Sequence, residues 1–137
     1  FTLRIGGKVG EGSGQPVDLP ITVRRIVSKA EQSFGRAKQA MGCGVWVSAA
    51  NNLDIFLNSI RTQTFHPDAF EQFGLKISDK KIVVVKSTQH FYAGFAPIAQ
   101  SVLYVSAPGS INMNFSEIGF KKFTDPYWPK VPDPRST

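Results

Sequence analysis

The sequence predicts an α/β fold: a mixed sheet with a βαβαβ parallel portion plus an N-terminal antiparallel hairpin portion. Three observations predict it: alternating apolar and polar residues at 17–27, a continuous β-branched run at 82–85, and short helical patterns between the later apolar runs. Strand–helix–strand connections of this kind join parallel strands by right-handed crossovers. The predicted organisation is a single α/β domain over 1–123, followed by an extended, proline-rich tail over 124–137.

The first half of the chain predicts strands joined by short connections. In order these are strands at 2–5, 17–27, 45–47 and 53–57, a glycine-rich connection at 6–16, a segment at 28–42 that fits a helix or a hairpin loop, and a turn at 51–52. Pro20 cannot donate a ladder hydrogen bond, so the second strand is expected at a sheet edge or interrupted there. Asn51 and Asn52 tolerate left-handed backbone and favour a tight turn.

The second half alternates helical and strand patterns. In order these are a helix at 67–73, a strand at 82–85, a helix at 90–100 and a strand at 101–106. Pro67 suits the first turn of its helix, and Gly74 lies just past the end. The β-branched run predicts a strand covered on both faces, so a charge at Val84 is expected to unfold the domain.

Composition indicates a globular domain. The 137 residues are 42% hydrophobic and 19% charged, and a chain of this length buries roughly two thirds of its unfolded surface. The single cysteine, Cys43, predicts a reduced, cytoplasmic protein with a buried thiol. No apolar stretch approaches the roughly 20 residues of a membrane span, so no membrane partner is expected. Phe1 already begins a strand-like pattern, which we interpret as a piece of a longer protein.

The positive charge does not predict nucleic-acid binding. The formal net charge is +6 and the pI is about 9.7. Phosphate binding depends on a dense stripe of Lys and Arg, whereas here Arg24-Arg25, Lys80-Lys81 and Lys121-Lys122 are isolated pairs. Solvated surface charge is the favoured interpretation.

Polar side chains follow two of the predicted strands. They are Asn58, Arg61 and Gln63 after the strand at 53–57, and Ser87, Gln89 and His90 after the run at 82–86. Ligand sites collect at the carboxyl ends of parallel strands, where loops and helix N-termini supply polar groups. If these two strands are parallel neighbours, the six side chains share one crevice.

Each of these residues has a chemical role and a structural alternative. Arg61 could grip a carboxylate with two hydrogen bonds, or pair with a surface acid such as Asp54 or Asp68. His90 could transfer a proton near neutral pH, or only pack at a helix end. Ser87 could cap a helix whose N-terminus faces the crevice. With two histidines in different elements and no cysteine pair, no metal site is predicted within this chain.

Four segments carry a family resemblance. They are GGKVGEGSG at 6–14, DIFLNSIRTQTF at 54–65, KIVVVKSTQHFYAGFAPIA at 81–99 and VLYVSAPG at 102–109. In this order they resemble the C-terminal domain of microcystinase C (MlrC-like) proteins. The resemblance extends from about Leu3 to Trp128, and KSTQHF is its most specific part.

The resemblance implies a zinc-dependent metallohydrolase, classed among metallopeptidases, whose founding member hydrolyses linearised microcystin fragments. Its zinc ligands lie in a preceding larger domain, so the implied partners are that N-terminal metal-binding domain of the same polypeptide and a small peptide or amide substrate. The residues that match the family's motif positions are Asn58, Arg61, Gln63, Gln89 and His90. Arg61 or His90 would serve the developing oxyanion, and Asn58, Gln63, Ser87 and Gln89 would bind substrate.

Two expectations follow for the isolated chain. Because the implied zinc ligands lie elsewhere, the segment alone is not expected to hydrolyse substrate. The alternative is a non-catalytic small-molecule or anion-binding module that uses the same strand-end crevice.

Overall fold

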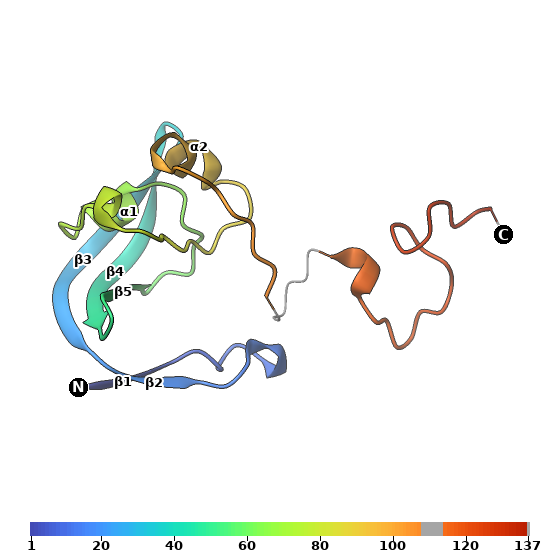
Figure 1. Cartoon of the computed structure of the whole chain (residues 1–137), viewed down its shortest axis with the longest axis horizontal. Coiled ribbons are helices and arrows are strands. Elements are labelled where there is room, and N and C mark those ends of the chain that lie inside the picture. The colour runs from blue at the N-terminus through green and yellow to red at the C-terminus, as the bar shows by residue number, and fades with distance from the viewer. Residues whose placement is uncertain (108–113, 137) are drawn as a thin grey trace. The chain divides into compact units, whose positions relative to one another are not determined.

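Hairpin pairing between neighbouring segments organises the strands of this computed structural model, which describes residues 1–107 and 114–136. β3 (Thr22–Phe34), β4 (Ala37–Ala49) and β5 (Leu53–Asn58) form an antiparallel sheet in chain order (Figure 1). β1 (Thr2–Ile5) and β2 (Val17–Pro20) form a separate two-stranded sheet. The helical elements are η1 (Glu11–Ser13), α1 (Asp68–Glu71), η2 (Ile77–Asp79), α2 (Tyr92–Phe95), η3 (Ala96–Ile98) and η4 (Phe115–Glu117).

Two tight turns join the strands of the larger sheet. Phe34 pairs with Ala37, so β3 and β4 are connected by the two-residue loop Gly35-Arg36, in which Gly35 has a φ of 59°. The segment 28–42, which fitted a helix or a hairpin loop, is therefore a hairpin. Asn51 and Asn52 have φ values of 59° and 60°, which confirms the predicted turn within the three-residue connection 50–52.

The core lies between the sheet and α1. Ala30, Met41, Ala69 and Phe73 form its buried centre, with Val27, Trp46 and Phe56 packed around them. Phe73 can enter because β4 has a glycine beneath it: a Cβ on Gly44 would lie 2.5 Å from Phe73 Cζ. The predicted helix at 67–73 is present in shorter form: α1 covers Asp68–Glu71 with Pro67 at its N-cap, a turn follows at 72–74, and Gly74 has a φ of 89°.

A second cluster joins α2 to this core. Ile77, Phe91 and Phe95 are buried together, and Phe70, Leu75, Val85 and Val102 pack against them. The Phe70 ring lies 6.2 Å from that of Phe95 and 4.8 Å from that of Phe56, so one aromatic side chain connects both clusters. The predicted helix at 90–100 is reduced to α2 and the 3-10 turn η3, because Pro97 and Gly94 interrupt a longer helix.

The predicted parallel portion is not formed. Among the described residues, 82–87 and 101–107 belong to no strand, although 53–57 is confirmed as part of β5. Ile82 and Val84 are 80% and 83% exposed, so the expectation that Val84 is central to a covered strand was wrong. The β-branched run favours extended backbone, but β5 pairs with β4 through the short turn at 50–52, and residues 82–86 pair with no strand.

Two smaller expectations have different outcomes. The predicted strand at 17–27 is interrupted at Ile21, next to Pro20, as expected from the missing N–H of proline. Cys43 was expected to be buried, but its side chain is exposed. Gly42, with a φ of 74°, shifts the alternation of β4, so that Met41 and Gly44 face the core and Cys43 turns outward.

The chain divides into two compact units. The first comprises 1–3 and 18–103 and holds both clusters described above; the second comprises 4–17 and 104–137. Within the second unit, Tyr127 donates a hydrogen bond to the Ile118 carbonyl and its ring lies 5.3 Å from that of Phe120. The single domain over 1–123 and the tail over 124–137 stay predictions about folding in solution. None of the helices in the described part of the chain has the length and apolar character needed to cross a membrane.

We predict that Gly44→Ala destabilises the protein by about 1–3 kcal/mol, the usual cost of forcing extra volume into a packed core. The new methyl group would lie 2.5 Å from Phe73 Cζ and 3.1 Å from Ala30 Cβ. Urea unfolding would measure the change. Gly119→Ala is the matched control, because a Cβ there meets nothing within 4 Å; equal stability of the two variants would contradict this packing.

Candidate functional site

The polar side chains that follow residue 57 and those that follow residue 86 contact each other in the first unit. The Ser87 hydroxyl lies 2.9 Å from Gln63 Oε1 and donates a hydrogen bond to it. The His90 ring stands edge-on to two aromatic rings, 5.3 Å from Phe34 and 5.8 Å from Phe65. One hydrogen bond thus joins the two predicted polar sets, and His90 lies against the rings of Phe34 and Phe65.

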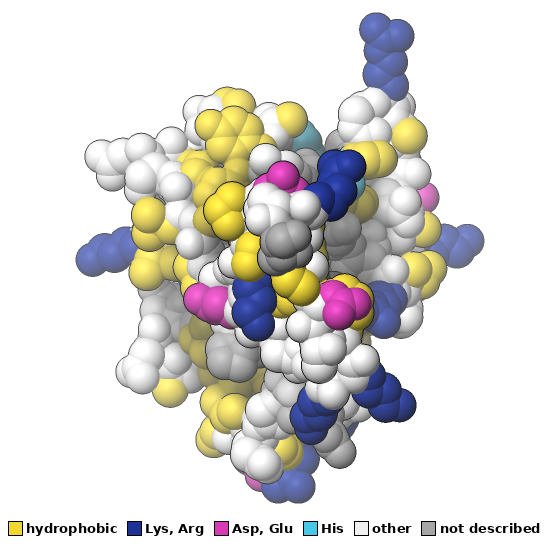
Figure 2. Space-filling view, turned by 90° about the vertical axis from the view of Figure 1, so that its right-hand side faces the viewer, with side chains coloured by type: hydrophobic (Ala, Val, Ile, Leu, Met, Phe, Trp, Pro, Cys, Tyr) yellow, Lys and Arg dark blue, Asp and Glu magenta, His cyan; other side chains and the backbone are white. Residues whose placement is uncertain are grey.

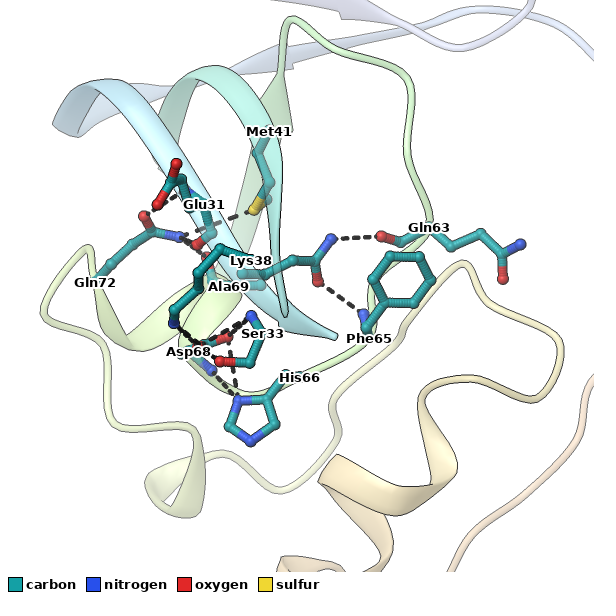
Figure 3. A network of polar contacts seen from close by, with 11 residues as sticks. Glu31, Ser33, Lys38, Met41, Gln63, Phe65, His66, Asp68, Ala69 and Gln72 are labelled. Carbon is teal, nitrogen blue, oxygen red and sulfur yellow. Dashed lines mark hydrogen bonds and ion pairs between the residues drawn. The ribbon is translucent and has the colours of Figure 1, made fainter. Parts of the chain in front are cut away.

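A buried amide holds the loop that carries Gln63. Gln32 is fully buried, and its Nε2 donates a 2.7 Å hydrogen bond to the Gln63 carbonyl (Figure 3). Its Oε1 accepts a hydrogen bond from the Phe65 N–H, also at 2.7 Å. One side chain of β3 thus fixes the backbone on both sides of residue 64.

α1 is bound to the edge of β3 by two further side chains. Gln72 accepts from the Glu31 N–H at 3.1 Å and donates to the Glu31 carbonyl at 2.8 Å, as a paired strand would. Asp68, one turn earlier, accepts from the Ser33 N–H and from the Ser33 hydroxyl (Figure 3). These contacts satisfy backbone hydrogen-bonding groups of an edge strand and hold α1 against β3.

Asp68 is the centre of a charged cluster. Its carboxylate lies 3.1 Å from Lys38 Nζ and 3.1 Å from His66 Nδ1. Burial alone would raise the pKa of Asp68, but hydrogen bonds from the Ser33 hydroxyl, the Ser33 N–H and Lys38, together with the His66 charge, lower it from 3.8 to about 2. The cluster therefore favours an ionised Asp68 in the folded protein.

A glycine allows α2 to approach this loop. A Cβ on Gly94 would lie 2.9 Å from the Phe65 carbonyl oxygen and 3.1 Å from Pro67 Cδ. The absence of a side chain at this position lets the backbone of α2 pack on the segment 65–67. His90, two residues before α2, is brought beside Phe65 by the same approach.

Asn58 and Arg61 lie at the end of β5 and just beyond it, and Gln89 lies shortly before α2. Asn58 ends β5, and its Nδ2 donates a hydrogen bond to the Ile60 carbonyl. The Gln89 carbonyl accepts from the Tyr92 N–H at 3.0 Å. Arg61 is exposed, and no hydrogen bond, ion pair or ring contact joins its side chain to another residue in the described ranges.

The expected surface partners of Arg61 are occupied by other residues. Asp54 pairs with Lys80 and accepts a 2.6 Å hydrogen bond from Trp46 Nε1. Asp68 pairs with Lys38 instead. The structural alternative for Arg61, an ion pair with one of these acids, is therefore wrong.

Ser87 does not cap a helix. α2 begins at Tyr92 with Phe91 at its N-cap, and no side-chain hydrogen bond caps it. The expected arrangement required the predicted helix at 90–100 to begin directly after Ser87, whereas residues 88–91 form a bend and a turn. A one-turn helix offers no macrodipole site for an anion, so the chemistry of this surface rests on its side chains.

The candidate residues lie on an open surface. Two open hollows among the described residues, of about 500 and 490 Å³, contain none of the six predicted site residues. Both involve Arg24 and Ser48, and the second adds Trp46, Asp54 and Lys80. A substrate bound near His90 would therefore need a second surface to enclose it.

The described residues do not fit a zinc site. Within 1–107 and 114–136, no group of three or more His, Cys, Asp or Glu side chains is placed to hold a metal ion. The nearest approach to one is His66 with Asp68, and that carboxylate already accepts hydrogen bonds from Ser33 and Lys38. A structural or catalytic zinc needs at least three protein ligands.

Sequence reasoning missed Gln32, Phe34 and Phe65. Ala30 and Gln32 are both buried and lie two residues apart on β3, so the alternation of a strand puts Gln32 on the core face. A polar residue at such a position indicates a structural hydrogen bond. This alternation could not be used to find Gln32, because residues 28–42 were not assigned to strands.

We predict that Gln32→Leu destabilises the protein by about 1–3 kcal/mol, because it leaves the Phe65 N–H without its acceptor and removes a donor from the Gln63 carbonyl. Chemical denaturation would measure the loss. Gln39→Leu is the control, since Gln39 pairs with Gln32 across the ladder but its amide reaches only the Ala40 carbonyl. Similar losses in both variants would contradict the role given to Gln32.

A second prediction concerns pH. The folded-state pKa of Asp68 is below its ordinary value, so the stability that this group provides is present above about pH 4 and is lost as the pH falls from about 4 to about 2. A shift from 3.8 to about 2 corresponds to about 2 kcal/mol.

Urea unfolding between pH 6 and pH 2 would test this prediction. Asp68→Asn should flatten the acid limb of stability against pH, whereas Asp79→Asn, at an exposed position, should keep the wild-type slope. Parallel curves for the wild type and Asp68→Asn would show that the cluster does not stabilise the ionised carboxylate.

Comparison with known proteins identifies the family. The family model described as the MlrC C-terminus matches residues 1–122. Microcystinase C from Sphingomonas sp is 33% identical over 132 residues, which make up 96% of this chain and 25% of that protein. The chain therefore spans about a quarter of the length of this curated relative. The resemblance inferred from the four segments is confirmed: the chain belongs to the MlrC C-terminus family.

Proposed function

We propose that this chain is the substrate-binding C-terminal part of an MlrC-like hydrolase that cleaves a peptide or amide bond. Membership of the MlrC C-terminus family supports the enzyme class. The observation that carries the proposed site is the hydrogen bond from Ser87 to Gln63, since it joins two motif segments through residues that are 24 positions apart in the sequence. An open surface that needs a second wall fits a role as one part of a larger active site.

Arg61 and His90 are the proposed catalytic residues. Arg61 carries a permanent charge and five donors, so it can bind a substrate carboxylate or a developing oxyanion. His90 can donate a hydrogen bond to an oxygen that gains charge, or transfer a proton near neutral pH. Edge contacts with Phe34 and Phe65 orient its ring.

The neighbouring polar residues are proposed to bind substrate. The amide NH₂ of Gln63 can donate to a peptide carbonyl while its Oε1 accepts from Ser87. Asn58 and Gln89 supply further amide groups on the same two motif segments. Amide side chains suit a peptide substrate because each provides both a donor and an acceptor.

Zinc, which the family resemblance implies, would be held outside the described residues of this chain. The proposal therefore assigns to this chain substrate binding and proton or charge stabilisation, and its partner is the N-terminal metal-binding domain of the same polypeptide. A cytoplasmic location is part of the proposal and is supported by the single cysteine, Cys43.

A non-catalytic anion-binding module is the second candidate, favoured by the exposed Arg61 side chain. Nucleic acid is not a proposed ligand. In the view of Figure 2, Lys and Arg side chains are accompanied by Asp, Glu and hydrophobic side chains. The sequence holds its paired basic residues in separate segments rather than in one dense run. The two candidates differ in whether changes at His90 alter turnover or only binding.

We predict that His90→Phe and Arg61→Ala, made in the full-length protein, each lower kcat for a peptide substrate by about 10²-fold or more, the usual size of an acid–base or oxyanion contribution. His90→Phe keeps a ring against Phe34 and Phe65 and removes the imidazole nitrogens. Arg36→Ala, in the exposed β3–β4 loop, is the control and should keep wild-type turnover.

Unchanged turnover in both variants would remove Arg61 and His90 from the mechanism. Weaker binding of small anions with no hydrolysis in any form of the protein would favour the binding module. The isolated chain, incubated with zinc and substrate, should not hydrolyse it, and measurable activity would refute the division of roles between two domains.

A further inference from the structure

An apolar segment of the first unit is exposed with the alternation of a strand. Ile82 and Val84 are 80% and 83% exposed, while Val83 is 39% exposed and Val85 packs on the cluster of Ile77, Phe91 and Phe95. Side chains of an extended chain point alternately to two sides. One side of residues 82–85 is therefore anchored on the core, and the other presents branched aliphatic groups to solvent.

The backbone of this segment forms no ladder. Residues 82–86 lie in no strand or helix, and no backbone–backbone hydrogen bond joins them to another residue of the described ranges. Val102 packs on the same cluster as Val85, and the next side chain, Leu103, is 83% exposed. A run of exposed apolar side chains on a segment with unused backbone donors and acceptors is a usual site for β-strand addition.

We propose that residues 82–85 are the edge on which a β-strand from the remaining part of the longer polypeptide docks. The inference rests on the proposed function, in which this chain completes a site with another domain. It is supported by length, because a relative that matches 96% of this chain is about four times as long. Residues 82–85 precede Ser87 and His90 in the sequence. A strand that docks on them would therefore bring a second surface to the candidate site, where it would help to enclose a substrate.

The flanking charges argue against a second copy of this chain as the occupant. Lys81 and Lys86 bracket the apolar run. A symmetric antiparallel pair of two such segments places Lys81 of one copy opposite Lys86 of the other, and like charges directly opposite destabilise a sheet. The strand that docks is expected to be apolar at its centre, with acidic residues at its ends.

Hydrogen exchange of the full-length protein, compared with the isolated 137-residue chain, tests this inference. Amides of 83–86 should exchange at least about tenfold more slowly in the full-length protein, because a ladder protects them. The glycine-rich connection at 6–14 serves as the internal reference. Equal exchange of 83–86 in both proteins would overturn the inference, as would protection in the isolated chain that rises with its concentration.

A pair of variants makes the test independent of exchange. Val84→Asp should leave thermal unfolding of the isolated chain unchanged and should lower the unfolding temperature of the full-length protein. Val9→Asp, at a position that is 75% exposed in the glycine-rich connection, is the matched control and should change neither. A Val84→Asp full-length protein as stable as the wild type would overturn the inference. Neither readout uses hydrolysis, so an inactive full-length protein with protected 83–86 amides would refute the proposed function and support the docking edge.

Discussion

The buried amide of Gln32 is the interaction on which the candidate site depends. Its two hydrogen bonds, both 2.7 Å long, join β3 to the loop at 63–65. A buried amide is costly to leave unpaired, so the loop conformation that satisfies it is strongly preferred. That conformation turns the Gln63 side chain toward Ser87 and places the Phe65 ring beside His90.

Side-chain hydrogen bonds to the backbone also hold α1 on the sheet. Asp68 and Gln72 lie one helical turn apart and bind the backbone of Ser33 and Glu31, two residues apart on the β3 edge. Two glycines then allow close packing. The absence of a side chain at Gly44 leaves room for the Phe73 ring, and its absence at Gly94 lets α2 approach Phe65. Polar side chains that satisfy an exposed edge thus determine which aromatic residues surround His90.

Elements set by local chemistry could be predicted from the sequence. Asn51-Asn52 fixes its turn through left-handed backbone, and Pro67 with Gly74 delimits α1, so these were correct. The run at 82–85 could not be assigned correctly, because a β-branched sequence favours extended backbone but does not say which partner pairs with it. The hairpin at 22–49 was predicted only in part: an antiparallel hairpin portion was expected, but the glycines and polar residues of β3 and β4 left 28–42 open between a helix and a hairpin loop.

The site was predicted only in part. Parallel strands were expected to bring Gln63 near Ser87 and His90. Gln63 and Ser87 do meet and His90 lies beside Phe65, but no parallel strands are involved: Gln32 holds the loop of Gln63, and α2 packs on the segment 65–67. Gln32 lies far from them in the sequence, and only a known register places it on the core face of β3. The comparisons add the family, and the zinc chemistry and substrate remain proposals for the full-length protein.

The most direct test of the link between Gln32 and the site is a nuclear Overhauser measurement on the folded chain. We expect cross-peaks between the ring protons of His90 and those of both Phe34 and Phe65, and we expect them to weaken or vanish in Gln32→Leu. Their absence from the wild-type spectrum, or their full persistence in the variant, would contradict the role of this buried amide.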